Sequence, residues 1–189
     1  GSSHGIGAAT ALAFAKEKCA VGLNFNKNPE GAEETAARIR AIGADVEIFQ
    51  ADVSDPGDCE TMVNAFIRRF GGIDVLINNA GGALKIPRGE FIDMPVEYWN
   101  NQIDLNLNAA AYTSRIAVRN MIDNKVRGKI INVSSIHSIV TWVKRKMLPY
   151  SPGKAGLNMF TKALACEIAR YGINVNGIAP GFIMTKLSA

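Results

Sequence analysis

The 189-residue sequence is poor in the residues that build metal sites and disulfide frameworks. It contains only three cysteines and two histidines, and Cys19, Cys59 and Cys166 stand far apart, without a CxxC pair or a nearby histidine. This distribution argues against a zinc site and a disulfide framework and favours a reducing, cytoplasmic setting. No apolar run reaches the ~18 residues that a transmembrane helix needs.

An excess of charge of one sign is also absent. The net charge of +4 comes from 21 basic and 17 acidic residues spread along the chain, without the basic stripe of a nucleic-acid-binding face. Hydrophobic residues make up 48% of the chain, enough to bury the core of one α/β domain, and no repeat or linker is evident. We therefore predict a single domain over residues 1–189 with a small-molecule ligand, and neither a nucleic acid nor a membrane as partner.

Strand and helix signals alternate along the chain. Short apolar runs predict buried strands at 20–25, 44–50, 73–77, 129–133 and 173–178. Helical patterns lie between them, at 6–18, 30–42, 55–70, 96–124 and 150–170. The alternation predicts βαβ units and therefore a parallel, doubly wound sheet with helices on both faces. In the first predicted helix, Ile6, Ala9, Leu12 and Ala13 lie on one stripe.

A glycine-rich turn from Gly1 to Gly7 runs into the first predicted helix. Glycine lets the backbone turn tightly, so that a pyrophosphate can approach amide groups at the positive end of the helix dipole. The turn is thus a candidate phosphate site, and a flexible chain end is the alternative. Further polar or turn-forming residues follow predicted strands directly, where ligands of parallel sheets bind; these are Asp52, Asn78–Asn79, Ser134–Ser135 and Pro180–Gly181.

Tyr150 and Lys154 are four residues apart, which places both side chains on one face of a helix. An ammonium group beside a phenol stabilises the phenolate, so Tyr150 is a candidate acid/base. The spacing by itself is common on helices and is more typical of a solvated face.

In this order and spacing, the motifs resemble those of the short-chain dehydrogenase/reductase family, from Gly1 to Thr185. The opening TGxxxGxG is present without its threonine, as Gly1, Gly5 and Gly7, and the NNAG motif is Asn78 to Gly81. The helix asparagine is Asn106, and the serine after the next strand is Ser135. The YxxxK motif is Tyr150 with Lys154, and the closing PGxxxT is Pro180, Gly181 and Thr185. The resemblance implies a Rossmann-type sheet of order 3-2-1-4-5-6-7, whose first and last strands lie outside these residues. We therefore expect residues 1–189 to be a fragment that is unstable and inactive when isolated.

The resemblance also implies catalytic roles for four residues. Tyr150 would pass a proton to or from the substrate oxygen, and Ser135 would hold that oxygen by a hydrogen bond. Lys154 would stabilise the phenolate and bind the nicotinamide ribose, while Asn106 would support a water molecule that links Lys154 to solvent. Hydride transfer between a nicotinamide and a secondary alcohol or ketone is the implied reaction, and it requires no metal.

The cofactor contacts that the resemblance implies come from several of these motifs. They are Gly1, Ser3, His4, Gly5, Ile6, Gly7, Asn26, Lys27, Asp52, Val53, Asn79, Ala80, Gly81, Tyr150, Lys154, Pro180, Gly181, Ile183 and Thr185. An NAD-preferring site places a carboxylate at the end of the second strand, where it would repel a 2′-phosphate. The corresponding stretch, 24–27, has no acid and ends in Lys27. NADP is therefore favoured over NAD, with Lys27 as a solvated turn residue as the alternative.

Candidate substrate contacts are Ser135, His137 and Trp142. Their arrangement resembles that of sugar and polyol dehydrogenases in this family, so a sugar, polyol or sugar acid is the favoured substrate, although the segment between Ser135 and Tyr150 is longer than usual. The basic run 144–146 is either a contact for an anionic substrate or a solvated face. Reduction of 3-oxoacyl thioesters is the alternative reaction, and a non-catalytic dinucleotide-binding scaffold or sensor is the alternative of another class.

The helices around Asn106 and Tyr150 carry more apolar surface than one sheet contact should cover. The residues concerned are Ala109, Ala110, Ile116, Val118, Leu157, Phe160 and Leu164. In the family such helices pair across a two-fold axis, which implies a homodimer or homotetramer; packing within the chain is the alternative.

Overall fold

The computed structural model describes residues 1–83, 90–141 and 147–185. The α-helices are α1 (Gly5–Lys16), α2 (Pro29–Ala41), α3 (Pro56–Phe70), α4 (Val96–Ile103), α5 (Ala109–Asp123) and α6 (Tyr150–Ile168). The strands are β1 (Val21–Phe25), β2 (Val46–Gln50), β3 (Val75–Asn78), β4 (Lys129–Val133) and β5 (Asn174–Ile178). Short 3-10 turns are η1 (Phe91–Asp93), η3 (Ile136–Ser138) and η4 (Ala169–Tyr171), and η2 (Asp104–Asn108) is a π-helical turn. The predicted alternation of helices and strands is confirmed.

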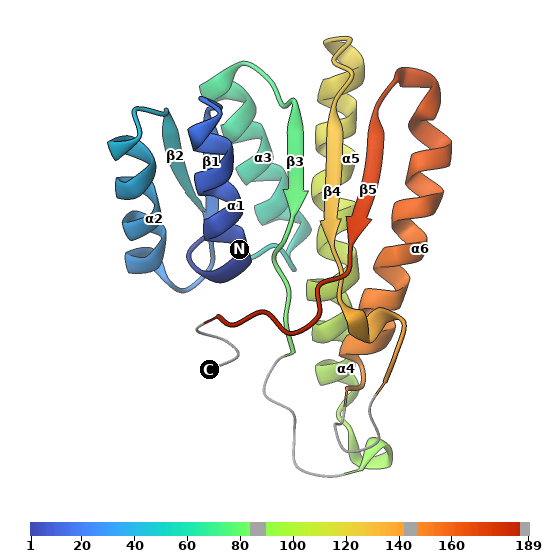
Figure 1. The fold of residues 1–189 in the computed structure, drawn as a ribbon. Coiled ribbons are helices and arrows are strands. Elements are labelled where there is room, and N and C mark those ends of the chain that lie inside the picture. The colour runs from blue at the N-terminus through green and yellow to red at the C-terminus, as the bar shows by residue number, and fades with distance from the viewer. Residues whose placement is uncertain (84–89, 142–146, 186–189) are drawn as a thin grey trace.

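All strand pairs are parallel, in two separate sheets of order β1-β2 and β3-β4-β5 (Figure 1). In the described residues, β1 and β3 therefore each pair on one side only. A cavity of about 450 Å³ lies between them, lined by residues of both strands and of α1, α3 and α5. This arrangement agrees with the predicted α/β class and with the predicted order, in which one more strand would separate 20–25 from 73–77.

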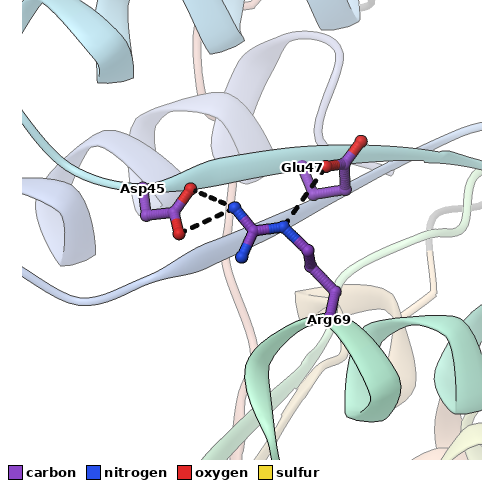
Figure 2. A network of polar contacts seen from close by, with 3 residues as sticks. All are labelled: Asp45, Glu47 and Arg69. Carbon is purple, nitrogen blue, oxygen red and sulfur yellow. Dashed lines mark hydrogen bonds and ion pairs between the residues drawn. The ribbon is translucent and has the colours of Figure 1, made fainter.

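Each sheet has its own hydrophobic core. The smaller sheet packs against α1 and α2, with the buried residues Ala11, Ala15, Val21, Leu23, Ala36, Ile39 and Val46. The larger sheet packs against α3, α5 and α6, with the buried residues Val63, Ile73, Ala117, Met121, Ile130, Ile168, Ile173 and Val175. Exposed ion pairs join α3, on the larger sheet, to the smaller sheet. Arg69 of α3 contacts Asp45, directly before β2, at 2.7 and 2.8 Å, and Glu47 of β2 at 3.6 Å (Figure 2). Exposed pairs contribute little stability, so the cores account for most of the packing energy.

Local signals explain where several helices begin and end. The Asp55 side chain accepts a hydrogen bond from Asp58 N at the start of α3, as expected of an N-cap, and Gly71 ends this helix with a φ of 85°. The predicted helix is confirmed as α1, but its stripe does not mark the buried face, since Ala9 and Ala13 are exposed and Gly7, Ala8, Ala11 and Ala15 are buried. The helix is apolar on all sides, so periodicity could not select a face, and the smallest side chains face the neighbouring backbone.

The long helix predicted over 96–124 is continuous in extent but not regular. The π-helical turn at Asp104–Asn108 interrupts it and contains Asn106, which is 2% exposed. Such turns shift the helical register and often occur at functional sites. The turn therefore directs the Asn106 side chain toward the interior beside α6.

Several apolar residues expected on an oligomer surface are covered within the chain. Ala109, Ala110 and Leu157 are buried, and Ile116, Val118 and Leu164 pack against the larger core. On α6 the exposed positions include Ala155, Met159 and Cys166. In the described ranges, no helix is long and apolar enough to cross a membrane.

Candidate active site

Lys154 is buried at the carboxyl end of β4. Its Nζ atom donates a hydrogen bond to the carbonyl oxygen of Val133 at 2.9 Å, and its own carbonyl oxygen accepts one from Ser134 Oγ at 3.1 Å. Burial lowers the pKa of the Lys154 amine from 10.5 to about 8, because the charged form loses hydration. Lys154 thus places an amine with a lowered pKa at this strand end.

Tyr150 is the first residue of α6 and lies near Lys154. The Lys154 Nζ atom is 6.0 Å from the centre of the Tyr150 ring, in agreement with the predicted placement on one helix face. The His137 ring meets the Tyr150 ring edge-on, with the ring centres 6.4 Å apart.

Ser135 follows β4 directly and is brought to the same place. Its Oγ atom accepts a hydrogen bond from His137 N at 3.2 Å, which starts the 3-10 turn η3. The next residue, Ile136, donates its N–H to Pro180 O at 2.9 Å, so the segment after β5 runs alongside. His137 therefore contacts both Ser135 and Tyr150.

Asn106 connects the π-helical turn to the backbone after β3. Its Oδ1 atom accepts from Gly82 N at 3.0 Å, and its Nδ2 atom lies 3.0 Å from Gly82 O, Gln102 O and Gln102 Oε1. Gly81 has no room for a side chain, since an added Cβ atom would be 2.8 Å from Lys154 Nζ and 2.9 Å from Asn106 Oδ1. Lys154 and Asn106 therefore face the same side of Gly81.

The glycine-rich turn lies against the end of β3. Asn79 Nδ2 donates to Gly1 O at 2.7 Å, and a Cβ atom at Gly7 would collide with the same carbonyl oxygen. Gly5 opens α1, and a Cβ atom there would be 3.4 Å from Thr185 Cγ2. The loop is therefore a glycine-rich cradle at a helix N-terminus, a geometry that fits a dinucleotide phosphate.

Asp52 is tied to the residues that follow β1. Its carboxylate accepts from Asn26 Nδ2 at 2.8 Å and from Ser54 N and Oγ at 3.0 and 2.6 Å. Burial raises the pKa of Asp52, but the hydrogen bonds from Ser54 and Asn26 and the charge of Lys27 outweigh it and leave this pKa below its ordinary value. The stretch 24–27 contains no acid itself, yet the fold brings the Asp52 carboxylate beside it.

The remaining predicted contacts differ in how well they are placed. Ser3 Oγ lies 3.0 Å from His4 Nδ1 at the start of α1, and Ala80 packs against Gly1. Val53 is buried and Ile183 is exposed. Ile6 is half-buried, and nothing lies within 4 Å of a Cβ atom built at Gly181. Trp142 and the basic run 144–146 lie outside the described residues.

Sequence reasoning missed three groups that hold the candidate residues in place. These are the Val133 carbonyl, the Gly82 backbone and the Gln102 side chain. Backbone partners leave no mark in a sequence. Gln102 could have been noticed as an amide four residues before Asn106 on the same helix face.

A sequence profile described as short chain dehydrogenase matches residues 1–189. The chain is also 39% identical over 189 residues to 3beta-hydroxysteroid dehydrogenase 1 of Eggerthella lenta, a match that covers 100% of this chain and 70% of that protein. This chain is a short-chain dehydrogenase. The general role of an oxidoreductase acting on alcohols or ketones follows from this membership.

Two further similarities concern a second enzyme and a solved structure. This short-chain dehydrogenase is 36% identical over 188 residues to glucose 1-dehydrogenase 2 of Bacillus subtilis, covering 98% of this chain and 70% of that one. A short chain dehydrogenase from Burkholderia cenocepacia in complex with NADP superposes with a TM-score of 0.90 at 30% identity, covering 100% of this chain and 74% of that one. The Rossmann-type fold predicted from the sequence is confirmed.

Proposed function

We propose that this short-chain dehydrogenase transfers a hydride between NADP and a secondary alcohol or ketone. The observation that carries the proposal is the convergence of Ser135, Tyr150 and Lys154 at the carboxyl end of β4, with Lys154 buried and its amine tied to Val133. A purely structural lysine at this depth would pair with a carboxylate, whereas the hydrogen bond recorded for this amine is to a backbone carbonyl. The nicotinamide would supply or accept the hydride.

The four residues would divide the remaining work. Tyr150 exchanges a proton with the substrate oxygen, and Ser135 orients that oxygen by a hydrogen bond. Lys154 stabilises the phenolate and binds the ribose of the cofactor. Asn106 keeps the Gly81–Gly82 backbone beside the Lys154 amine.

NADP is the proposed cofactor because Lys27 offers a cation at the end of β1. The glycine cradle at the start of α1 would hold the pyrophosphate, and Thr185, in the segment after β5, lies next to Gly5 of this cradle. Asp52 lies beside Asn26 but is engaged by Ser54 and Asn26, which leaves Lys27 to contact a 2′-phosphate. The NADP complex of the Burkholderia cenocepacia relative is consistent with this choice.

The residues around Ser135 and Tyr150 favour a substrate with an apolar body. Ile139, Val140 and Leu148 flank the two candidate residues in the chain and are 72%, 41% and 40% exposed. Burial of these side chains against an apolar substrate would contribute binding free energy, and they offer no hydrogen-bond partners for the hydroxyl groups of a sugar. A 3-oxoacyl thioester or a hydrophobic cyclic ketone is therefore proposed ahead of a sugar or polyol, which the arrangement of Ser135, His137 and Trp142 had favoured.

A substrate panel tests this order. With NADPH, kcat/KM should be at least about tenfold higher for an apolar ketone or 3-oxoacyl thioester than for acetoin, a small polar ketone. Roughly 1.4 kcal/mol of additional apolar contact suffices for that ratio. With NADP, glucose should be oxidised more slowly than an apolar secondary alcohol. Preference for glucose would instead support the sugar dehydrogenase reading.

We also propose a homo-oligomer that uses the exposed face of α6. Met159 is 64% exposed at the centre of this helix, flanked one turn to either side by Ala155 and Ala163, which are also exposed. Small residues around one large apolar side chain allow a second helix to approach closely. We propose this face as the oligomer interface in place of the apolar residues that the sequence suggested and that the fold covers within the chain.

Substitution of Tyr150 by phenylalanine tests the reaction itself. Tyr150→Phe should lower kcat by at least about a thousandfold, because it removes the proton that the substrate oxygen exchanges. The Kd of NADPH, measured by fluorescence titration, should stay within about twofold. Substantial turnover by this variant would eliminate Tyr150 as the acid/base, and loss of NADPH binding would place it in the cofactor site instead.

A further inference from the structure

Gln102 is buried where α4 joins the π-helical turn and lies against α6. Its exposed fraction is 0%, and a Cβ atom added to Gly153 of α6 would come within 3.8 Å of its carbonyl oxygen. The same added atom would be 3.1 Å from Asn106 Cβ. Gln102 and Asn106 therefore form one packed unit beneath the first turn of the Tyr150 helix.

Two of the three acceptors around Asn106 Nδ2 belong to Gln102. The amide nitrogen carries two hydrogens, and the carbonyl oxygen and Oε1 of Gln102 and the carbonyl oxygen of Gly82 each lie 3.0 Å away. With Nδ2 surrounded by acceptors, the other end of the amide, Oδ1, must face the Gly82 N–H. The Gln102 side chain thus adds a third acceptor to two backbone carbonyls and helps to fix which way the Asn106 amide points.

Gln102 is a poor choice for stability alone. Among the described residues, its Nε2 atom is buried without a hydrogen-bond partner. A buried amide with an unmet donor destabilises a fold, and methionine would fill a similar volume without this penalty. A polar residue at this position is therefore better explained by what its oxygen holds than by packing.

We propose that Gln102 is a positioning residue of the dehydrogenase site, which clamps the Asn106 amide so that its oxygen faces the Gly82 N–H, on the same side of Gly81 as the Lys154 amine. The inference rests on the proposed function, because it assigns Gln102 to the same reaction. Without this side-chain oxygen, the Gln102 and Gly82 carbonyls and the Gly82 N–H alone hold the Asn106 amide, so the anchor of the Gly81–Gly82 backbone beside Lys154 loosens. The reacting groups then spend less time in the productive arrangement, while the distant phosphate cradle is unchanged.

Three variants of the full-length protein test the proposal. Gln102→Met removes the acceptor at similar length, Gln102→Glu keeps an oxygen acceptor in its place, and Thr35→Val is a control. Thr35 is buried on α2, where its hydroxyl donates to Gly31 O at 2.9 Å, far along the chain from Asn106. The Asn106 side-chain amide is followed by NMR in protein labelled with ¹⁵N-asparagine, and its signals are assigned by their loss in Asn106→Asp.

In Gln102→Met, the amide protons of Asn106 should exchange with solvent at least about tenfold faster, and kcat should fall about tenfold while the KM for NADPH stays within twofold. Gln102→Glu should restore kcat to within about threefold of the original protein, and Thr35→Val should leave the Asn106 signals unchanged. Unchanged Asn106 signals in Gln102→Met overturn the proposal, as does a loss of activity that Gln102→Glu fails to rescue. If the original protein reduces no ketone, the proposed function fails, and the amide exchange still decides whether Gln102 clamps Asn106.

Discussion

Replacement of Lys154 by methionine should stabilise the unliganded protein near neutral pH while it abolishes turnover. The buried amine has a pKa of about 8 in the folded chain against an ordinary value of 10.5. Since the folded state disfavours the charged form, protonation stabilises the unfolded chain more than the folded one. The destabilisation is complete below pH 8, decreases as the pH rises toward 10.5 and is absent above it.

The magnitude follows from the distance between the two pKa values. At about 1.36 kcal/mol per pH unit, the charged amine lowers the free energy of unfolding by about 3.4 kcal/mol at most. Linkage then gives about 3.3 kcal/mol at pH 7, about 2 at pH 9 and about 0.8 at pH 10. Methionine also loses the hydrogen bond to Val133 O, which offsets about 1.5–3 kcal/mol. Lys154→Met should therefore be more stable by roughly 1 kcal/mol at pH 7.

Urea unfolding of both proteins between pH 7 and pH 10 measures this difference. The free energy of unfolding of the original protein should rise relative to Lys154→Met by about 2.5 kcal/mol over that range, since all other titrations cancel. Lys162→Met, which removes an exposed lysine of the same helix, should show no such rise. A difference that stays constant with pH would refute the reasoning, because it would mean that the Lys154 amine keeps its hydration in the folded state.

Three further variants address the cofactor and the assembly. Gly7→Ala should raise the Kd of NADPH at least about tenfold, because its Cβ atom would collide with the Gly1 carbonyl oxygen. Gly72→Ala should leave this Kd unchanged, because the nearest neighbour of its Cβ atom would be 3.5 Å away. Equal Kd values for the two variants would exclude the glycine cradle from the cofactor site. Lys27→Ala should raise the KM for NADPH about five- to tenfold and leave that for NADH unchanged in steady-state assays, and parallel changes would argue against a contact to the 2′-phosphate. Met159→Glu should split the oligomer in light scattering, and an unchanged mass would exclude this face of α6 as the interface.

The regular elements could be predicted because their signals are local. Asp55 begins α3 and Gly71 ends it, and both act through bonds to residues a few positions away. Continuous apolar runs marked the strands within about two residues. The buried face of α1 could not be predicted for the opposite reason, since apolar residues surround this helix and no local signal marks one side.

The candidate site likewise has a part that local sequence signals predict and a part that they do not. Tyr150 and Lys154 were predictable as a pair, because four residues on a helix make one turn. Their partners were not, since the Val133 carbonyl and the Gly82 backbone belong to segments far away in the chain. The approach of the Asp52 carboxylate to Asn26 likewise depends on β1 and β2 lying side by side.

By itself, the sequence determined the family, the order of elements and the identity of the residues with acid, base or donor groups, because these depend on residue type and spacing. Only the tertiary structure decided which backbone groups hold those residues, in which direction the Lys154 pKa is displaced and that the Gln102 side chain accepts a hydrogen bond from Asn106. The physical reason is burial. A side chain's desolvation and its hydrogen-bond partners are set by elements that meet only when the chain folds.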